Sequence, residues 1–118
     1  MKRILSIAFS LFAFAFANAE KYDLCIYGDT SAGVVAAYSA AQLNMKVVLV
    51  APETRLGGLT TGGLGQTDIG NKQVVQGIAK QFYRTLGQHY GTLESWVFEP
   101  KVALGIMEQY ASHKNITL

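Results

Sequence analysis

Apolar and polar residues follow patterns along this chain that change character several times. The run from Asp23 to Tyr27 is short, apolar and β-rich, which is typical of a buried central strand in a parallel sheet. Small residues dominate the stretch from Ala32 to Asn44, which predicts a helix that approaches a sheet closely. A second, mostly apolar run from Lys46 to Val50 predicts a second buried strand. Strand, helix and strand in this order predict a right-handed crossover and a parallel strand pair.

The second half of the chain returns to helical spacing. The segment from Gln73 to Tyr90 predicts one amphipathic helix. The apolar face of this helix would consist of Val74, Val75, Ile78, Phe82 and Leu86. Pro100, at the favoured first helical position, opens another predicted helix. The apolar stripe of that helix would consist of Val102, Ile106, Met107 and Tyr110, and a strand is expected to begin at residues 115–118.

The first nineteen residues form a separate unit. Lys2 and Arg3 precede an apolar run from Ile4 to Ala17, and Ala17-Asn18-Ala19 has the small residues of a cleavage site. The apolar run is shorter than the roughly 18 residues that a membrane span needs. We therefore expect residues 1–19 to be a signal peptide, the protein to be periplasmic or secreted, and no stable membrane anchor to remain. An uncleaved anchor is the alternative.

Composition limits the classes of function. The chain has ten Lys and Arg against eight Asp and Glu, and two of the basic residues belong to the leader. The rest is near neutral and has no basic cluster, so we expect no nucleic-acid partner. Cys25 is the only cysteine, and we expect it to be buried in the first strand as a small inert hydrophobe. His89 and His113 have no ligand partners at suitable spacing, so no metal site is predicted.

The segment Gly28 to Gly33, Gly-Asp-Thr-Ser-Ala-Gly, keeps the two outer glycines of a dinucleotide-binding turn. Thr30 replaces the middle glycine, which normally lets the backbone approach a pyrophosphate. Free N–H groups where the helix begins favour an anion that accepts several hydrogen bonds. The candidate pyrophosphate-binding residues are Gly28, Thr30, Ser31, Ala32 and Gly33. A strand, turn and helix that bind nothing are the alternative.

The residues after the second strand carry the next candidates. The acid that would bind the ribose hydroxyls is replaced by Ala51, so Glu53 is the candidate, with a merely solvated carboxylate as the alternative. The loop that follows has two glycine pairs beside hydroxyls and an arginine, which suit a phosphate or a flavin edge. Its candidate residues are Arg55, Gly57, Gly58, Thr60 and Thr61. A flexible surface loop is the alternative, but the place of the loop after a nucleotide-type strand favours a ligand.

These segments together resemble the start of the FAD-dependent oxidoreductase family, which has the glutathione-reductase-type FAD fold. The resemblance rests on Tyr22 to Gly33, Val47 to Pro52, Leu56 to Gly65, Thr67 to Asn71 and Trp96 to Pro100. It implies FAD as the cofactor, with its pyrophosphate at Gly28 to Gly33 and its ribose near residues 51–53. The loop from Gly57 to Gly63 would lie along the rest of the cofactor, toward the isoalloxazine.

We therefore expect an α/β fold, namely an incomplete Rossmann-like FAD/NAD(P)-binding domain with a parallel β-α-β start and two further helices. Residues 20–118 would form the N-terminal part of the FAD-binding domain of an exported flavoprotein oxidoreductase. The full-length parent would bind FAD and an unknown small-molecule substrate. The alternatives are a truncated, catalytically inactive fragment and an NAD-binding module. No residue is assigned as a catalytic acid or base.

Overall fold

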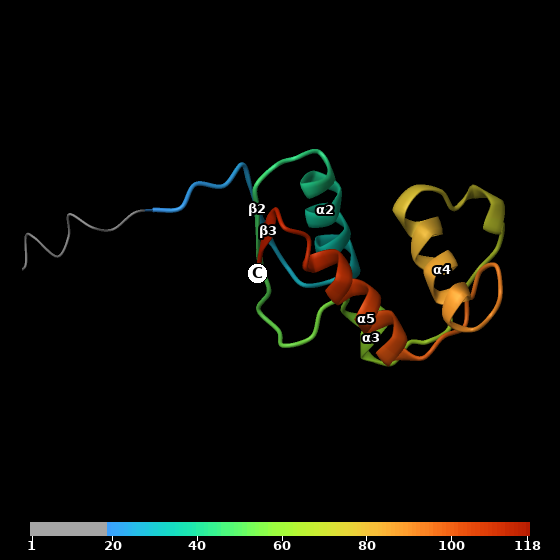
Figure 1. Cartoon of the computed structure of the whole chain (residues 1–118). Coiled ribbons are helices and arrows are strands. Elements are labelled where there is room, and N and C mark those ends of the chain that lie inside the picture. The colour runs from blue at the N-terminus through green and yellow to red at the C-terminus, as the bar shows by residue number, and fades with distance from the viewer. Residues whose placement is uncertain (1–18) are drawn as a thin grey trace, which may run out of the picture.

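The computed structural model describes residues 19–118, so the predicted signal peptide lies outside the described residues except for Ala19 (Figure 1). The elements in chain order are β1 (Leu24–Tyr27), α2 (Ser31–Gln42), β2 (Val47–Val50), α3 (Leu59–Gly62), the 3-10 helix η1 (Lys72–Val74), α4 (Gly77–His89), α5 (Pro100–Ala111) and β3 (Ile116–Thr117). Within this range, no helix combines the length and the apolar character that a membrane crossing requires.

The sheet has three parallel strands in the order β1-β2-β3, with β2 in the middle. Leu24 to Tyr27 pair in register with Val47 to Val50, and Val47 also pairs with Ile116. The predicted parallel β-α-β start is therefore confirmed. The strand expected near the end of the chain is also present, as β3.

Helix α2 begins and ends at residues suited to those places. The Thr30 side chain caps its start by accepting a hydrogen bond from the Gly33 N–H at 3.4 Å. Ala37, Ala40 and Ala41 are buried in the helix, and their small side chains permit close packing on β1 and β2. The chain leaves the helix through Asn44, whose φ of 63° is a left-handed conformation that asparagine tolerates well.

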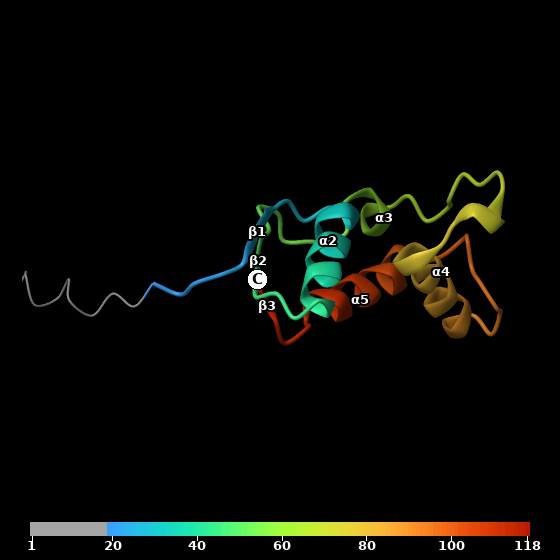
Figure 2. The same cartoon turned by 90° about the horizontal axis from the view of Figure 1, so that it is seen from above.

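Helices α2 and α5 lie on the same side of the sheet (Figure 2). This arrangement follows from the right-handed crossovers, since β1, β2 and β3 are added in one direction. Pro100 stands at the first turn of α5, and the predicted stripe is buried at Ile106, Met107 and Tyr110. The Tyr110 ring stacks on the Tyr38 ring of α2 with centroids 4.5 Å apart.

The opposite face of the sheet is not covered by any helix of the described residues (Figure 2). Tyr27 is 77% exposed and Val50 is 40% exposed. Cys25 lies on the same face and is exposed, so the expectation of a buried cysteine is wrong. The apolar strand pattern predicted burial on both faces, whereas α2 and α5 cover only one.

The predicted helix from Gln73 to Tyr90 is interrupted. Its first part is η1, and α4 begins only at Gly77, whose φ is 61°. Phe82 and Leu86 are buried as predicted, but Val74 is 72% exposed. The glycine-rich loop predicted after the second strand is not wholly irregular, because it contains the short helix α3.

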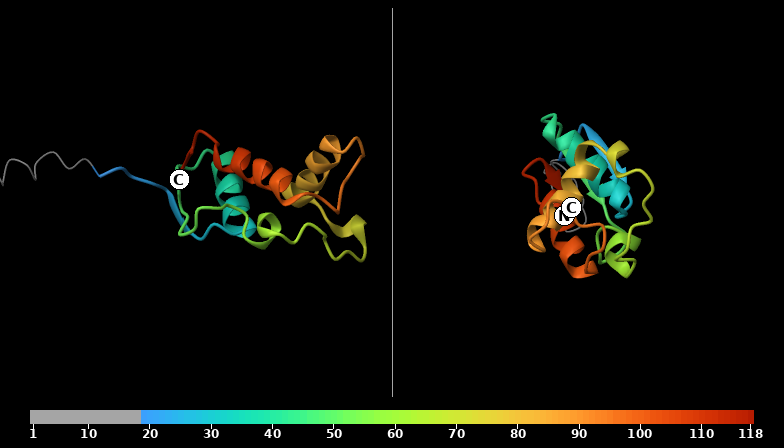
Figure 3. Two further views of the ribbon diagram at one scale, coloured as in Figure 1. Left: turned by 90° about the horizontal axis from the view of Figure 1, so that it is seen from below. Right: turned by 90° about the vertical axis from the view of Figure 1, so that its right-hand side faces the viewer.

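Helix α4 packs on α5 and lies at the end of the molecule remote from the sheet (Figures 1 and 3). Trp96 stacks on Tyr83 of α4 with ring centroids 3.7 Å apart. Phe98 meets Phe82 edge to face at 5.8 Å. These aromatic contacts hold α4 against the segment that leads into α5.

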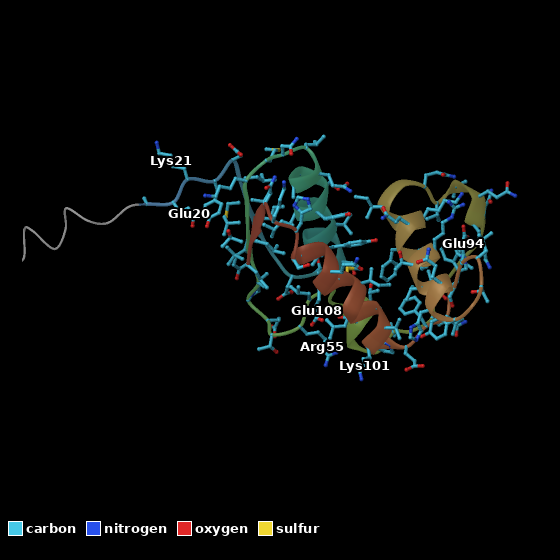
Figure 4. All side chains as sticks on the ribbon, in the orientation of Figure 1. Glu20, Lys21, Arg55, Glu94, Lys101 and Glu108 are labelled. Atoms are coloured by element: carbon cyan, nitrogen blue, oxygen red, sulfur yellow. The ribbon has the colours of Figure 1, made fainter. Side chains whose placement is uncertain are left out.

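The amino end of the sheet, where β1 and β2 begin, is held by polar contacts. The Lys46 backbone N–H donates to Oδ2 of Asp23 at 2.7 Å. The Lys46 ammonium forms an exposed ion pair with Glu20 at 2.7 Å. The hydrogen bond from Lys46 and a second one from the Tyr22 hydroxyl lower the pKa of the Glu20 carboxyl. Figure 4 shows Glu20 on the segment that enters the sheet at this end.

Candidate cofactor-binding site

Strands β1 and β2 finish side by side at the carboxyl end of the sheet. The loop that follows β2 and helix α3 lie at this same end (Figure 1). The Gly28 N–H donates to the Val50 carbonyl at 2.9 Å, and the Gly57 N–H donates to the Asp29 carbonyl at 2.6 Å. An isolated parallel bridge joins Thr30 to Gly57. The fold therefore brings the glycine turn and the loop after β2 into direct contact.

The two outer glycines of the turn have the structural roles expected of them. Gly28 has a φ of +128°, which only glycine adopts easily. A Cβ built on Gly33 would lie 2.0 Å from the Gly28 carbonyl oxygen. With any residue other than glycine at position 33, α2 could therefore not pack this closely against the turn. A Cβ built on Gly28 would meet no atom within 4 Å. The turn is therefore tight on the protein side and open on the other side.

The start of α2 offers hydrogen-bond donors to this open side. Thr30 uses its side chain to cap the helix, and its carbonyl accepts from the Val34 N–H at 3.0 Å. Ser31 and Ala32 are the first two helical residues, whose N–H groups have no partner within a helix. The first turn of α2 contains no acidic residue that would compete with an anion for the positive end of the helix dipole. This arrangement suits an anion with several acceptor oxygens.

The hydroxyls of Ser31 and Thr60 are occupied with the protein itself. Ser31 Oγ lies 2.8 Å from the Gly57 carbonyl oxygen and 2.8 Å from Thr60 Oγ1. A carbonyl can only accept and a serine hydroxyl has one hydrogen, so Ser31 donates to Gly57 and accepts from Thr60. Both hydroxyl protons are thereby used. The donors left for a phosphate are the backbone N–H groups of α2.

The other candidate residues of the loop after β2 differ in their exposure to solvent. Arg55 is exposed and donates from Nη1 to the Thr61 carbonyl at 3.1 Å; Figure 4 shows it beside α3. Thr61 is fully buried, and its hydroxyl bonds to the carbonyls of Leu56 and Gly58. A Cβ built on Gly57 would lie 2.4 Å from Thr61 Cγ2. Thr61 thus supports the loop from inside, while Arg55 faces outward.

An apolar pocket of about 160 Å³ adjoins the loop. Its walls come from α2, α3, α4 and α5 and include Val35, Ile78, Phe82 and Met107. Ser31 and Thr60 also line it, so the pocket shares one candidate residue with the glycine turn and one with the loop after β2.

Sequence reasoning missed Asp29. Its side chain is only 6% exposed, and Oδ2 accepts a hydrogen bond from the Glu53 backbone N–H at 2.7 Å. Glu53 itself is exposed, and Ala51 is half-buried. The available signal was an acid inside the glycine turn of a chain that lacks the acid expected at residue 51.

Metal ligands do not gather at this end of the sheet. Among residues 19–118, no three or more His, Cys, Asp and Glu residues form a group that could hold a metal ion. The groups at the site that could contact a ligand are backbone N–H groups and one arginine, which donate hydrogen bonds, and the carboxylates of Asp29 and Glu53, which accept them.

Comparisons with known proteins agree with this geometry. The family model described as FAD dependent oxidoreductase matches residues 23–118, which include every element from β1 to β3. No curated protein and no solved structure gives a significant match. The cofactor that the family implies is FAD. The chain belongs to the FAD-dependent oxidoreductase family.

Proposed function

We propose that this chain binds the adenosine diphosphate part of FAD at the carboxyl end of its sheet, as part of an exported flavoprotein oxidoreductase. The observation that carries the proposal is the start of α2. There the N–H groups of Ser31 and Ala32 have no partner among residues 19–118, and Gly28 leaves open space where another residue would place a side chain. A diphosphate supplies the negative charge and the acceptor oxygens that this place suits.

The residues present fit the cofactor. The turn offers donors and space, and Arg55 offers an exposed cation on the neighbouring loop. When bound, FAD supplies a hydride acceptor, and the protein contributes binding and orientation. The hydrogen bonds from Ser31 Oγ to the Gly57 carbonyl and from the Gly57 N–H to the Asp29 carbonyl fix the glycine turn and the loop after β2 relative to each other. No residue of this chain is assigned as the acid or base of the reaction.

Export is part of the same proposal. It is based on the basic start, the apolar run and the Ala17-Asn18-Ala19 site in the first nineteen residues. A noncovalent cofactor would then be acquired outside the cytoplasm.

The test is a calorimetric titration of the full chain with FAD, using a variant that changes charge where α2 begins. Ala32 is exposed, and Ala32→Asp places a carboxylate in the first helical turn. An acid there stabilises the helix through its dipole but repels a diphosphate. We expect about tenfold weaker FAD binding, from roughly 1–2 kcal/mol of repulsion, without a lower unfolding temperature.

The matched control is Ala36→Asp, because Ala36 is also exposed but lies one turn further along α2. It should change the affinity for FAD less than about threefold, because screening by water weakens repulsion at this distance. Equal FAD affinities for the wild type and Ala32→Asp would contradict the proposed site. A wild-type chain that binds no FAD would support the inert fragment, and tighter binding of NAD⁺ than of FAD would support the NAD-binding module.

A further inference from the structure

Asp29 lies where the missing ribose-binding acid would be needed. In dinucleotide-binding folds this acid usually ends the second strand. Here Ala51 has no side-chain group that could accept a hydrogen bond. The Asp29 carboxylate reaches the same place from the other strand, because its Oδ2 accepts the Glu53 backbone N–H at 2.7 Å. Asp29 is thus fixed beside residues 51–53 by a contact that the fold itself provides.

One oxygen of this carboxylate remains available. Among the described residues no hydrogen bond to Asp29 Oδ1 is formed, whereas Oδ2 is bound. Within the same part of the chain, the Tyr110 hydroxyl is the only buried side-chain oxygen or nitrogen without a partner, so solvent reaches Asp29 Oδ1. An ionised carboxylate only accepts hydrogen bonds, and it bonds well to hydroxyl donors such as those of a ribose.

We infer that Asp29 binds a ribose hydroxyl of the adenosine and so replaces the acid missing at residue 51. The inference rests on the proposed binding of FAD. Glu53 is the rival, but its side chain is exposed and would have to be ordered on binding. The Asp29 side chain is already buried and oriented, so its bond to the ribose costs less conformational entropy.

The experiment compares FAD with analogues that lack one ribose hydroxyl of the adenosine. Calorimetry would give the dissociation constants of FAD and of its 2′-deoxyadenosine and 3′-deoxyadenosine analogues for the full chain. We expect the wild type to prefer FAD over at least one analogue by about tenfold or more, as for a hydrogen bond to a charged group. Asp29→Asn should reduce this preference to less than about threefold.

Two further variants serve as controls. Asp23→Asn removes a carboxylate that accepts a backbone N–H at the same distance of 2.7 Å, but at the other end of the strand pair. Glu53→Gln removes the rival carboxylate. Both should keep the wild-type preference for FAD. Adding Ala51→Glu to Asp29→Asn should restore the preference, because it returns an acid to the end of β2.

The outcomes separate the inference from the proposed function. A wild type that binds FAD and both deoxy analogues equally well would overturn the role of Asp29 alone. Loss of the preference in Glu53→Gln, with its retention in Asp29→Asn, would assign the ribose to Glu53. A wild type that binds no FAD would overturn the proposed function and this inference together.

Folding of the variant is checked by circular dichroism. The amide oxygen introduced by Asp29→Asn can still accept the Glu53 N–H, so this variant should retain the loop. If the variant does not fold, a wild-type measurement decides. A FAD analogue with a 2′-phosphate on the adenosine should bind at least about tenfold more weakly than FAD, because the phosphate meets a carboxylate. Equal affinity would overturn the inference.

Discussion

The two ends of the β1–β2 pair use the same contact in different surroundings. At the amino end Asp23 accepts the Lys46 backbone N–H, and at the carboxyl end Asp29 accepts the Glu53 backbone N–H, both at 2.7 Å. Asp23 is exposed beside the ion pair of Lys46 with Glu20, whereas Asp29 is only 6% exposed. An identical hydrogen bond should contribute more where water cannot replace it.

The two ends of the strand pair also differ in the hydrogen-bonding groups that remain without a partner among the described residues. At the amino end, the polar groups bond mainly to one another, and the turn at Asn44 closes on α2 through hydrogen bonds to Ala40 and Ala41. At the carboxyl end, the first N–H groups of α2 are unpartnered and the space at Gly28 is open. Free donors and open space at the carboxyl end are what the proposed binding of FAD requires, and the amino end does not offer this combination.

The largest expected effect comes from Gly33→Ala at the carboxyl end. The new Cβ would lie 2.0 Å from a backbone oxygen, so β1 and α2 must separate. We expect a loss of about 3 kcal/mol or more in unfolding free energy, measured by urea denaturation. The control is Gly105→Ala in α5, where a Cβ meets nothing within 4 Å. It should stabilise the protein by up to about 1 kcal/mol. Equal effects of both substitutions would contradict the close packing at the turn.

Substituting each of the two aspartates by alanine should have a smaller effect on stability and compares the two ends directly. Asp29→Ala removes the largely buried carboxylate that accepts the Glu53 N–H, and we expect a loss of about 2 kcal/mol in unfolding free energy by urea denaturation. Asp23→Ala should cost less than about 1 kcal/mol, because water can replace the exposed carboxylate. Equal losses of unfolding free energy in Asp29→Ala and Asp23→Ala would mean that burial does not strengthen the hydrogen bond at the carboxyl end.

The smallest expected effect is a gain in unfolding free energy away from both ends of the strand pair, where the rings of Tyr38 on α2 and Tyr110 on α5 stack. The buried Tyr110 hydroxyl has no partner among the described residues, so Tyr110→Phe should stabilise the protein by about 1 kcal/mol while keeping the stack. Burial, and secondarily Tyr38, raises the pKa of Tyr110.

The raised pKa also gives a pH dependence of known sign. The folded state holds the Tyr110 proton more tightly than the unfolded state does, so stability is lost as the pH rises above the ordinary tyrosine value of about 10. Thermal unfolding of Tyr110→Phe should show less of this alkaline loss than the wild type. A destabilised Tyr110→Phe would mean that the hydroxyl does have a partner.

Much of the fold could be predicted because local residues determine it. The glycines at 28 and 33 predicted the turn, and Pro100 and its apolar stripe predicted α5. The break at Gly77 could not be predicted from apolar spacing, because spacing does not report that a glycine adopts a positive φ. The exposure of Cys25 was also missed, since apolar composition cannot tell which face of a strand the helices cover.

The site was predictable as a set of segments but not in the roles of single side chains. Sequence order placed Ser31 and Thr60 in the same site, and their oxygens lie 2.8 Å apart. The pattern could not show that Thr61 is fully buried, because that depends on the short helix α3. Asp29 was missed because its contact with Glu53 joins two loops, after β1 and after β2, that are distant in sequence.

The uncovered face of the sheet carries a single reactive thiol to which a chemical label can be attached. Cys25 is the only cysteine of the chain, and it is exposed on that face. A maleimide dye would therefore attach to each molecule at one defined point, on the edge strand β1. Whatever comes to cover the face would slow that reaction, so the labelling rate would measure its occupancy in solution.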